Sequence, residues 1–205
     1  MHVIALTGGI ASGKTTLLSA LRGLGAPVAD ADRISRSLTA PGGEALPAIR
    51  ETFGDAVFNE DGTLNRKALA EMIFSDEEAR HRLETILHPM IAIIINRELD
   101  AFRQAGHLAA VVDIPLLYES GMESLADEVW CAYVPKKEQV RRLRIRDGIT
   151  QKQAIQRLSS QMDPREKRRR ADEVIRTDGT IAQSAAQVTQ LWRETMHKLG
   201  GTAHE

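Results

Sequence analysis

The chain has 205 residues, a formal net charge of −1 and a single cysteine. Its near-neutral charge gives no global attraction to nucleic acid or to an anionic membrane, and its longest apolar run, residues 90–95, is too short to cross a bilayer. The N-terminus lacks a cationic flank followed by an apolar segment, so we expect no secretion signal. Cys131 cannot form an internal disulfide, and we expect a buried thiol in a cytoplasmic protein of one α/β domain, residues 1–205.

The first segment of the chain predicts a strand, a phosphate-binding loop and a helix. An apolar strand over residues 2–7 precedes a G-x-x-x-x-G-K-[ST] motif at residues 8–15, and a helical stretch follows at 16–21. In this context the loop amides surround a polyphosphate, Lys14 reaches the β- and γ-phosphates, and the Thr15 hydroxyl can ligate Mg²⁺. An ordinary glycine-rich turn is the alternative. We expect ATP to bind Ala11, Ser12, Gly13, Lys14, Thr15 and Thr16.

Short β-branched runs alternate with longer helical patterns along the rest of the chain, which is typical of βα units around a parallel sheet. Further strands are predicted at residues 27–30, 108–114, 128–134 and 172–176. Ligands of such sheets gather at the carboxyl ends of the strands. Gly8, the Asp30–Asp32 segment and Asp113 follow the first three strands, so we expect them along one edge of the sheet.

A helical insertion over residues 36–106 follows the second strand. Ser75 with Glu78 is a candidate capping box at a helix start. Pro89 disfavours helical backbone at His88, so we expect a break there and a second helix from residue 90 to 104, ending at Gly106. The insertion is larger than a crossover needs, and we interpret it as a lobe that covers the acceptor substrate.

A second interruption, residues 147–165, is predicted to be a small helical lid. Thr150 with Gln153 is a capping box, and Asp163-Pro164 is a helix start. Solvated helix faces explain most of the nearby arginines, but a mobile lid needs at least one of them to neutralise phosphate charge. The nearby arginines are Arg141, Arg142, Arg144, Arg146, Arg157, Arg165, Arg168, Arg169 and Arg170.

Thr180 with Gln183 is a further capping box, and it precedes a final amphipathic helix that reaches residue 199.

Several classes of phosphate-binding protein can be set aside. The chain has neither the switch motif nor the base-recognition motif of a GTPase, and it lacks the length and partner motifs of helicases and transporter ATPases. A small kinase remains, whose acceptor could be a nucleoside or a nucleoside monophosphate. A regulatory module that binds nucleic acid through residues 165–170 is the other alternative. It is disfavoured by neutral charge and by only two Trp, two Tyr and four Phe.

Along almost its whole length the chain resembles the dephospho-coenzyme A kinase family, through motifs that are specific in their order and spacing. The resemblance implies a P-loop NTPase-type three-layer αβα fold with a five-stranded parallel sheet. It also implies transfer of the ATP γ-phosphoryl group, with Mg²⁺, to the ribose 3′-hydroxyl of dephospho-coenzyme A. The matching residues are Leu6-Thr7-Gly8-Gly9-Ile10, Lys14-Thr15-Thr16, Asp30-Ala31-Asp32, Gly62-Thr63-Leu64-Asn65-Arg66, Leu87-His88-Pro89, Asp113-Ile114-Pro115-Leu116-Leu117-Tyr118-Glu119, Arg142-Leu143, Arg146-Asp147-Gly148, Arg157, Gln161-Met162, Ala171-Asp172 and Val174-Ile175.

The resemblance assigns catalytic roles to three residues. The position of Asp32 is that of the base that orients the acceptor hydroxyl, and Asp30 is then the cap of the helix that follows. Lys14 holds phosphate. Arg146 is the expected lid arginine, with Arg142 as second choice.

Other positions are expected to hold metal and acceptor. Asp113, at the end of a strand, is placed to hold Mg²⁺ together with Thr15, although a polar strand end would explain it as well. His88, Leu116 and Leu117 are candidates for the acceptor site, against a structural role for the histidine and core packing for the leucines.

Two positions depart from the family pattern. Ala11 stands where glycine is common, and a methyl group is tolerated there if φ is negative. Thr177 stands where asparagine is frequent near the adenine, which puts one base contact in doubt.

Overall fold

The computed structural model describes residues 1–200, so residues 201–205 of the predicted domain lie outside the described part. The chain forms two compact units. One consists of Met1–Ala29 with Leu99–Glu205, and the other is Asp30–Glu98. Each unit is described by itself below. None of the helices in residues 1–200 is both long and apolar enough to cross a membrane.

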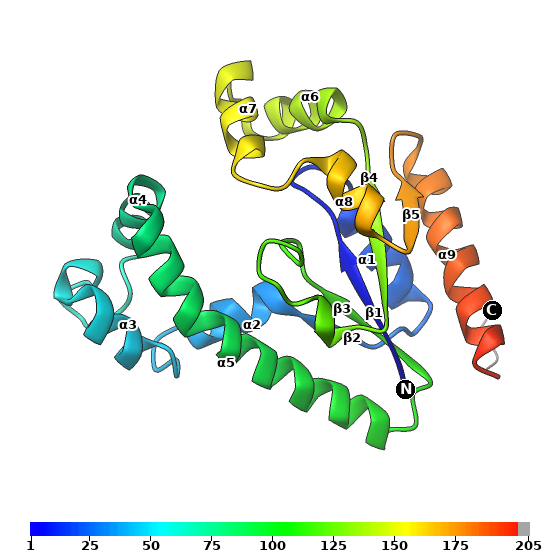
Figure 1. The fold of residues 1–205 in the computed structure, drawn as a ribbon, viewed down its shortest axis with the longest axis horizontal. Helices are drawn as coiled ribbons and strands as arrows, with labels where there is room; N and C mark the ends of the chain where they lie inside the picture. The colour runs from blue at the N-terminus through cyan, green and yellow to red at the C-terminus, as the bar shows by residue number, and fades with distance from the viewer. Residues whose placement is uncertain (201–205) are drawn as a thin grey trace. The chain divides into compact units, whose positions relative to one another are not determined.

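The first unit is built on the predicted parallel sheet (Figure 1). The strands β1 (His2–Thr7), β2 (Val28–Asp30), β3 (Ala109–Asp113), β4 (Glu128–Tyr133) and β5 (Glu173–Arg176) have the order β2-β3-β1-β4-β5. All five strand predictions are confirmed to within one residue at either end. In the register of the sheet, Leu6 lies opposite Asp113 and Thr7 lies opposite Cys131. The ends of β1 and β3 are therefore adjacent.

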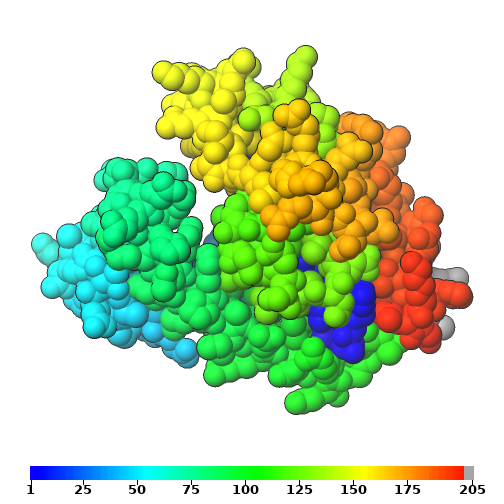
Figure 2. Space-filling view, viewed as in Figure 1, coloured from blue at the N-terminus to red at the C-terminus, as the bar shows by residue number. Residues whose placement is uncertain are grey.

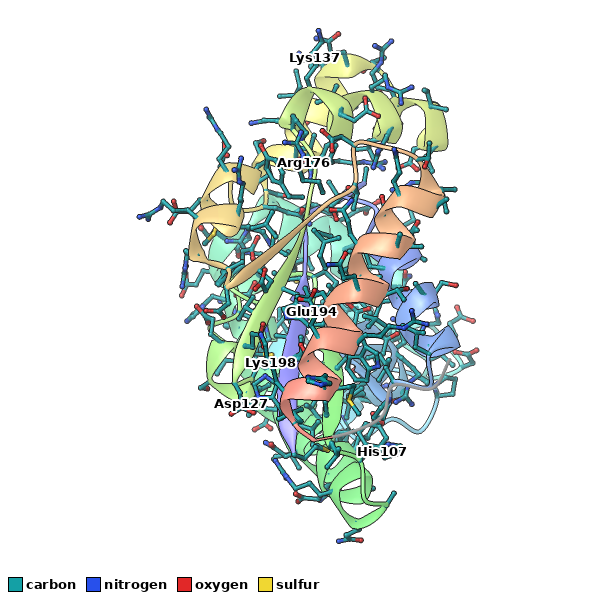
Figure 3. All side chains as sticks on the ribbon, turned by 90° about the vertical axis from the view of Figure 1, so that its right-hand side faces the viewer. His107, Asp127, Lys137, Arg176, Glu194 and Lys198 are labelled. Atoms are coloured by element: carbon teal, nitrogen blue, oxygen red, sulfur yellow. The ribbon has the colours of Figure 1, made fainter. Side chains whose placement is uncertain are left out.

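Helices cover both faces of this sheet, so the predicted three-layer α/β class is confirmed. On one face, α1 (Lys14–Gly23) packs against α9 (Ile181–Lys198), which Figure 3 shows running over the strands. Side chains of a strand alternate between faces. Trp130 belongs to the core under α1 and α9, and its neighbour Cys131 faces the opposite side, where α8 (Pro164–Arg170) packs on β4. The core under α1 and α9 includes Ile4, Leu6, Leu17, Leu21, Val111, Trp130, Val188 and Trp192.

Two more helices of this unit follow the carboxyl end of β4. Figure 3 shows Arg176 at one end of the strands, towards Lys137 of α6 (Lys136–Asp147), and Asp127 at the other end. After α6 comes α7 (Gln151–Ser159), which lies beside α6 at the periphery of the unit (Figure 2). A short 3₁₀ turn, η2 (Glu123–Leu125), precedes β4.

The predicted caps of this unit are confirmed. Thr150 and Thr180 both form complete capping boxes, with Gln153 and Gln183 respectively. Asp163 caps α8 through the amide of Arg165, at 2.8 Å. In each case the signal is local, because the cap and the amide that it satisfies are separated by no more than three residues.

The second unit contains α2 (Ala31–Leu38), α3 (Leu46–Phe53), the 3₁₀ turn η1 (Asp55–Val57), α4 (Arg66–Ser75) and most of α5 (Glu77–Gln104). The expected capping box at Ser75 is wrong. Ser75 is the last residue of α4, and its hydroxyl donates back to the carbonyls of Glu71 and Met72. Asp76 caps α5 instead, by accepting from the amides of Glu78 at 2.9 Å and Ala79 at 3.1 Å.

The expected break at His88-Pro89 is also wrong, because α5 runs through Pro89 without interruption. Proline removes the N–H that would bind the carbonyl of Thr85. Both Pro89 and Thr85 are exposed, so water can reach that carbonyl. The buried stripe of the helix continues on both sides of the proline and outweighs the local penalty; its members are Leu83, Ile91, Ile95 and Leu99.

Candidate active site

The loop between β1 and α1 is a tight turn held by its own backbone hydrogen bonds. Its internal hydrogen bonds run from Ser12 N to the Gly9 carbonyl and from Thr16 N to the Gly13 carbonyl, both at 3.0 Å. Within residues 1–200, no hydrogen bond uses the amides of Ala11, Gly13, Lys14 or Thr15. Gly13 has a φ of +87°, in the left-handed region. The unused amides stand at the N-terminus of α1, where partial positive charge accumulates.

Ala11 adopts a backbone conformation that its sequence position did not reveal. Its φ is +58°, whereas every other described residue with positive φ is glycine. The condition for a tolerated methyl group, a negative φ, is therefore not met. Left-handed backbone costs an L-residue roughly 1–2 kcal/mol. The loop thus carries strain next to its unused amides, and the contacts of its neighbours must maintain it.

Lys14 and Asp113 form an ion pair at the carboxyl edge of the sheet. The Lys14 ammonium contacts the Asp113 carboxylate, and the two side chains are 14% and 7% exposed. Their proximity follows from the sheet, since Asp113 lies opposite Leu6 just before the loop. The Lys14 side chain is therefore mostly buried against Asp113 and does not extend into solvent. The two residues expected to hold phosphate and metal are in direct contact.

Thr177 supports the loop from the end of β5. The residue is 4% exposed, and its hydroxyl donates to the carbonyls of Ser12 and Tyr133. Arg142 donates to the carbonyl of Thr177 and, at 2.9 Å, to Glu138. A contact of the Thr177 hydroxyl with an adenine would compete with its bond to Ser12. No local signal in the sequence indicates this support, because the bond joins residues far apart in the chain.

Two glutamines hold the middle of the loop, and neither received a role from the sequence. Ile10 N donates to Gln161 Oε1 at 2.8 Å, and Gln139 Nε2 donates to the Ile10 carbonyl at 3.1 Å. Gln139 is fully buried in α6. Both backbone polar groups of Ile10, the residue before Ala11, are thereby fixed, which helps to maintain the strained residue.

The lid segment begins with a cluster of charges. Arg146 and Arg157 both donate to the Asp147 carboxylate, at 2.7 and 2.6 Å. The hydrogen bond from Arg146 is the main reason that the pKa of Asp147 lies below its usual range. Arg146 itself is mostly exposed. Arg142 lies beside the P-loop, since a Cβ placed on Gly13 would lie 3.4 Å from its guanidinium.

In the second unit, the two aspartates of the Asp30-Ala31-Asp32 segment have different environments. Asp30 caps α2 by accepting from the amide of Arg33 at 2.9 Å, so its predicted capping role is confirmed. Asp32 is exposed in the first turn of the same helix. His88 lies within α5, where burial lowers the pKa of its imidazole.

The two leucines that follow Pro115 in the first unit differ as well. Leu116 is 42% exposed and Leu117 is fully buried. Leu117 is thus a core side chain in this structure, and the acceptor roles of both leucines stay predictions.

The site can be compared with known proteins. A family model described as "Dephospho-CoA kinase" matches residues 2–183. A dephospho-CoA kinase from Shouchella clausii is 42% identical over 95% of this chain and 99% of its own length. A dephospho-CoA kinase structure from Campylobacter jejuni is 28% identical, covers 96% of this chain and 98% of that one, and has a TM-score of 0.72. The structure of TT1252 from Thermus thermophilus is 31% identical, covers 94% and 97%, and has a TM-score of 0.80.

Proposed function

This chain belongs to the dephospho-CoA kinase family, and we propose that it transfers the γ-phosphoryl group of ATP to the ribose 3′-hydroxyl of dephospho-coenzyme A at the P-loop edge of its sheet. The observation that carries the proposal is the Lys14–Asp113 pair beside a loop with unused amides. Phosphoryl transfer depends mainly on alignment and charge neutralisation, which these groups can supply. A cytoplasmic location, where Cys131 stays a buried thiol, is part of the proposal.

Binding of the triphosphate requires an exchange of partners by Lys14. In the structure its ammonium neutralises Asp113. A β- or γ-phosphate oxygen is a competing anion, and the unused amides within residues 11–16 would hold the same phosphates. When Lys14 turns to phosphate, the Asp113 carboxylate is released from the pair. The ion pair therefore keeps both charges satisfied in the nucleotide-free protein.

The Thr15 hydroxyl and the Asp113 carboxylate fit a Mg²⁺ ion. Both are hard oxygen donors, the type that Mg²⁺ prefers, and Thr15 is exposed at the start of α1. No group of three or more His, Cys, Asp or Glu side chains that could hold a metal occurs within residues 1–200. That agrees with an ion bound by one or two protein oxygens and substrate phosphates. When bound, Mg²⁺ would neutralise charge on the phosphates.

Asp32 is the proposed base. Asp30 caps α2, so Asp32 is not needed as the cap of that helix. Its exposed carboxylate can accept a proton from the acceptor hydroxyl. His88, Leu116 and Leu117 are the proposed acceptor contacts. The helical segment 36–106 would cover the acceptor.

The arginines of the 147–165 lid would complete the neutralisation of phosphate. Arg146 is the proposed catalytic arginine, and its present partner Asp147 is shared with Arg157. Phosphate oxygens compete with that carboxylate as they do with Asp113. Arg142, already beside the loop, is the alternative.

The test is an acceptor panel with Mg²⁺ and ATP. ADP release should be fast with dephospho-coenzyme A and negligible with adenosine and nucleoside monophosphates, and ³¹P NMR of the product should show a 3′-phosphomonoester. Preferred turnover of a nucleoside or a monophosphate would make the chain a different small-molecule kinase. ATP binding without turnover of any acceptor would favour a regulatory nucleotide-binding module.

A further inference from the structure

A buried lysine and a glutamate join three segments around the site. Lys167 of α8 is fully buried, and its ammonium donates to the Pro115 carbonyl at 2.9 Å and to Glu119 Oε2 at 2.8 Å. Burying an ammonium group is costly unless it is paired and hydrogen-bonded. Such a pair contributes little net stability compared with apolar side chains of similar size. Stability alone therefore does not explain why the Lys167–Glu119 pair is present.

One end of this pair reaches the loop that follows Asp113. The Pro115 carbonyl also accepts from the Thr7 hydroxyl at 3.2 Å, and Ile114 N donates to the Leu6 carbonyl at 3.1 Å. Thr7 is the last residue of β1, directly before the P-loop. The backbone beyond Asp113 is thus fixed to the end of β1, directly before the P-loop, by two bonds, and to α8 by a third bond from Lys167.

The other end of the pair reaches the exit of the lid segment. Glu119 Oε1 accepts from Met162 N at 2.9 Å. The preceding residue, Gln161, accepts from Ile10 N in the P-loop at 2.8 Å. Two consecutive residues after α7 are therefore attached to two different parts of the site. Through Glu119 and Lys167, the lid exit, the P-loop and the loop after Asp113 form one closed set of hydrogen bonds.

We propose that Lys167 and Glu119 are positioning residues for phosphoryl transfer, which hold the backbone beyond Asp113 in register with the P-loop and provide the fixed end about which the lid moves. This inference rests on the proposed roles of Asp113 and of the lid. Neither residue needs to touch substrate. A misplacement of about 1 Å in such a site can lower the rate by roughly a hundredfold.

The test separates positioning from stability by removing both charges together. Lys167→Met alone leaves the Glu119 carboxylate without its ammonium, so it should lower the melting temperature. The double variant Lys167→Met/Glu119→Met leaves no buried charge, so its melting temperature should return close to that of the wild type. Its kcat should nevertheless remain roughly ten- to a hundredfold below wild type, because the connection is lost.

A matched control exists on the same helix. Arg169 and Glu166 pair at 2.7 Å on the exposed side of α8, and within residues 1–200 this pair connects no other segment. The double variant Arg169→Met/Glu166→Met removes the same two charges and should keep wild-type kcat. If the buried double variant regains both its melting temperature and its kcat, the pair is only structural and the inference is overturned.

Two further measurements decide the remaining cases. If the buried double variant does not fold, hydrogen exchange of the wild-type Met162 amide, followed by NMR, tests the anchor directly. Slowing by at least about tenfold relative to an unprotected amide supports it, and unprotected exchange contradicts it. Asp113→Asn is assayed in parallel. Full turnover of Asp113→Asn would refute the proposed role of Asp113 and the inference with it. If Asp113→Asn loses turnover but Lys167→Met/Glu119→Met is fully active, only the inference is refuted.

Discussion

Replacing Thr177 with valine tests whether the P-loop is supported from β5. Valine keeps the shape of threonine but has no O–H, so the Ser12 carbonyl loses its donor. Thr177 is only 4% exposed, so water cannot easily replace that donor. A buried acceptor left unsatisfied costs about 1–3 kcal/mol. A chain of about 200 residues loses roughly 2–4 °C of melting temperature per kcal/mol. We expect a decrease of roughly 2–12 °C.

The same change should weaken ATP binding. Ser12 directly precedes Gly13 and Lys14, whose amides are proposed to face phosphate. When the Ser12 carbonyl is no longer held, ATP must order the loop as it binds. Each 1.4 kcal/mol of that ordering raises the dissociation constant about tenfold. We expect an increase of roughly three- to thirtyfold for Thr177→Val, for an ordering cost of about 0.7–2 kcal/mol.

Circular dichroism melting and titration calorimetry with ATP measure the two effects. Thr177→Ser is the control, because serine keeps the hydroxyl and loses only a methyl group. It should remain closer to wild type than valine in both measurements. A valine variant with wild-type melting temperature and ATP affinity would refute the argument, as would a serine variant that loses as much as valine does.

The remaining predictions concern the charged residues. Asp32→Asn should lower turnover by about a hundred- to ten-thousandfold at unchanged ATP affinity, whereas Asp30→Asn should cost little because asparagine also caps; steady-state kinetics of both would reveal reversed roles. Lys14→Ala should lower turnover by roughly a hundredfold or more and also reduce the melting temperature, since Asp113 loses its cation; a fully active, stable variant would contradict the site. Hydrogen bonds from arginines, chiefly Arg141, lower the pKa of Glu138 from 4.5 to about 2. Its ionised form therefore stabilises the fold above about pH 4.5, and this stabilisation is lost as the pH falls towards 2; the melting-temperature difference between wild type and Glu138→Gln should shrink over that range.

Much of the fold could be predicted because its signals are local. Apolar β-branched runs defined all five strands, and the caps at Thr150, Asp163 and Thr180 act within three residues. The P-loop was identified in the same way, since its glycines, Lys14 and Thr15 are consecutive. Sequence reasoning also separated the capping Asp30 from Asp32, because a helix start needs only one cap.

Local signals failed where packing opposed them or two signals competed. Pro89 disfavours helix at His88, yet α5 continues because its buried stripe extends on both sides of the proline. Ser75 and Asp76 are adjacent candidates for one helix start. The carboxylate of Asp76 accepts from the first amides of α5, whereas Ser75 is the last residue of α4 and its hydroxyl donates to a carbonyl of that helix. The positive φ of Ala11 is likewise set by the loop around it.

The sequence by itself determined the strands, the phosphate-binding motif and the family resemblance of this protein, because those properties depend on residue types at fixed, mostly short spacings. Only the tertiary structure decided that Lys14 rests on Asp113, that Thr177 supports Ser12, and that Lys167 and Glu119 together connect Met162 to the loop after Asp113. These contacts join residues that lie between 43 and 165 positions apart in the sequence. Their partners are selected by sheet register and burial, which no local pattern of residues records.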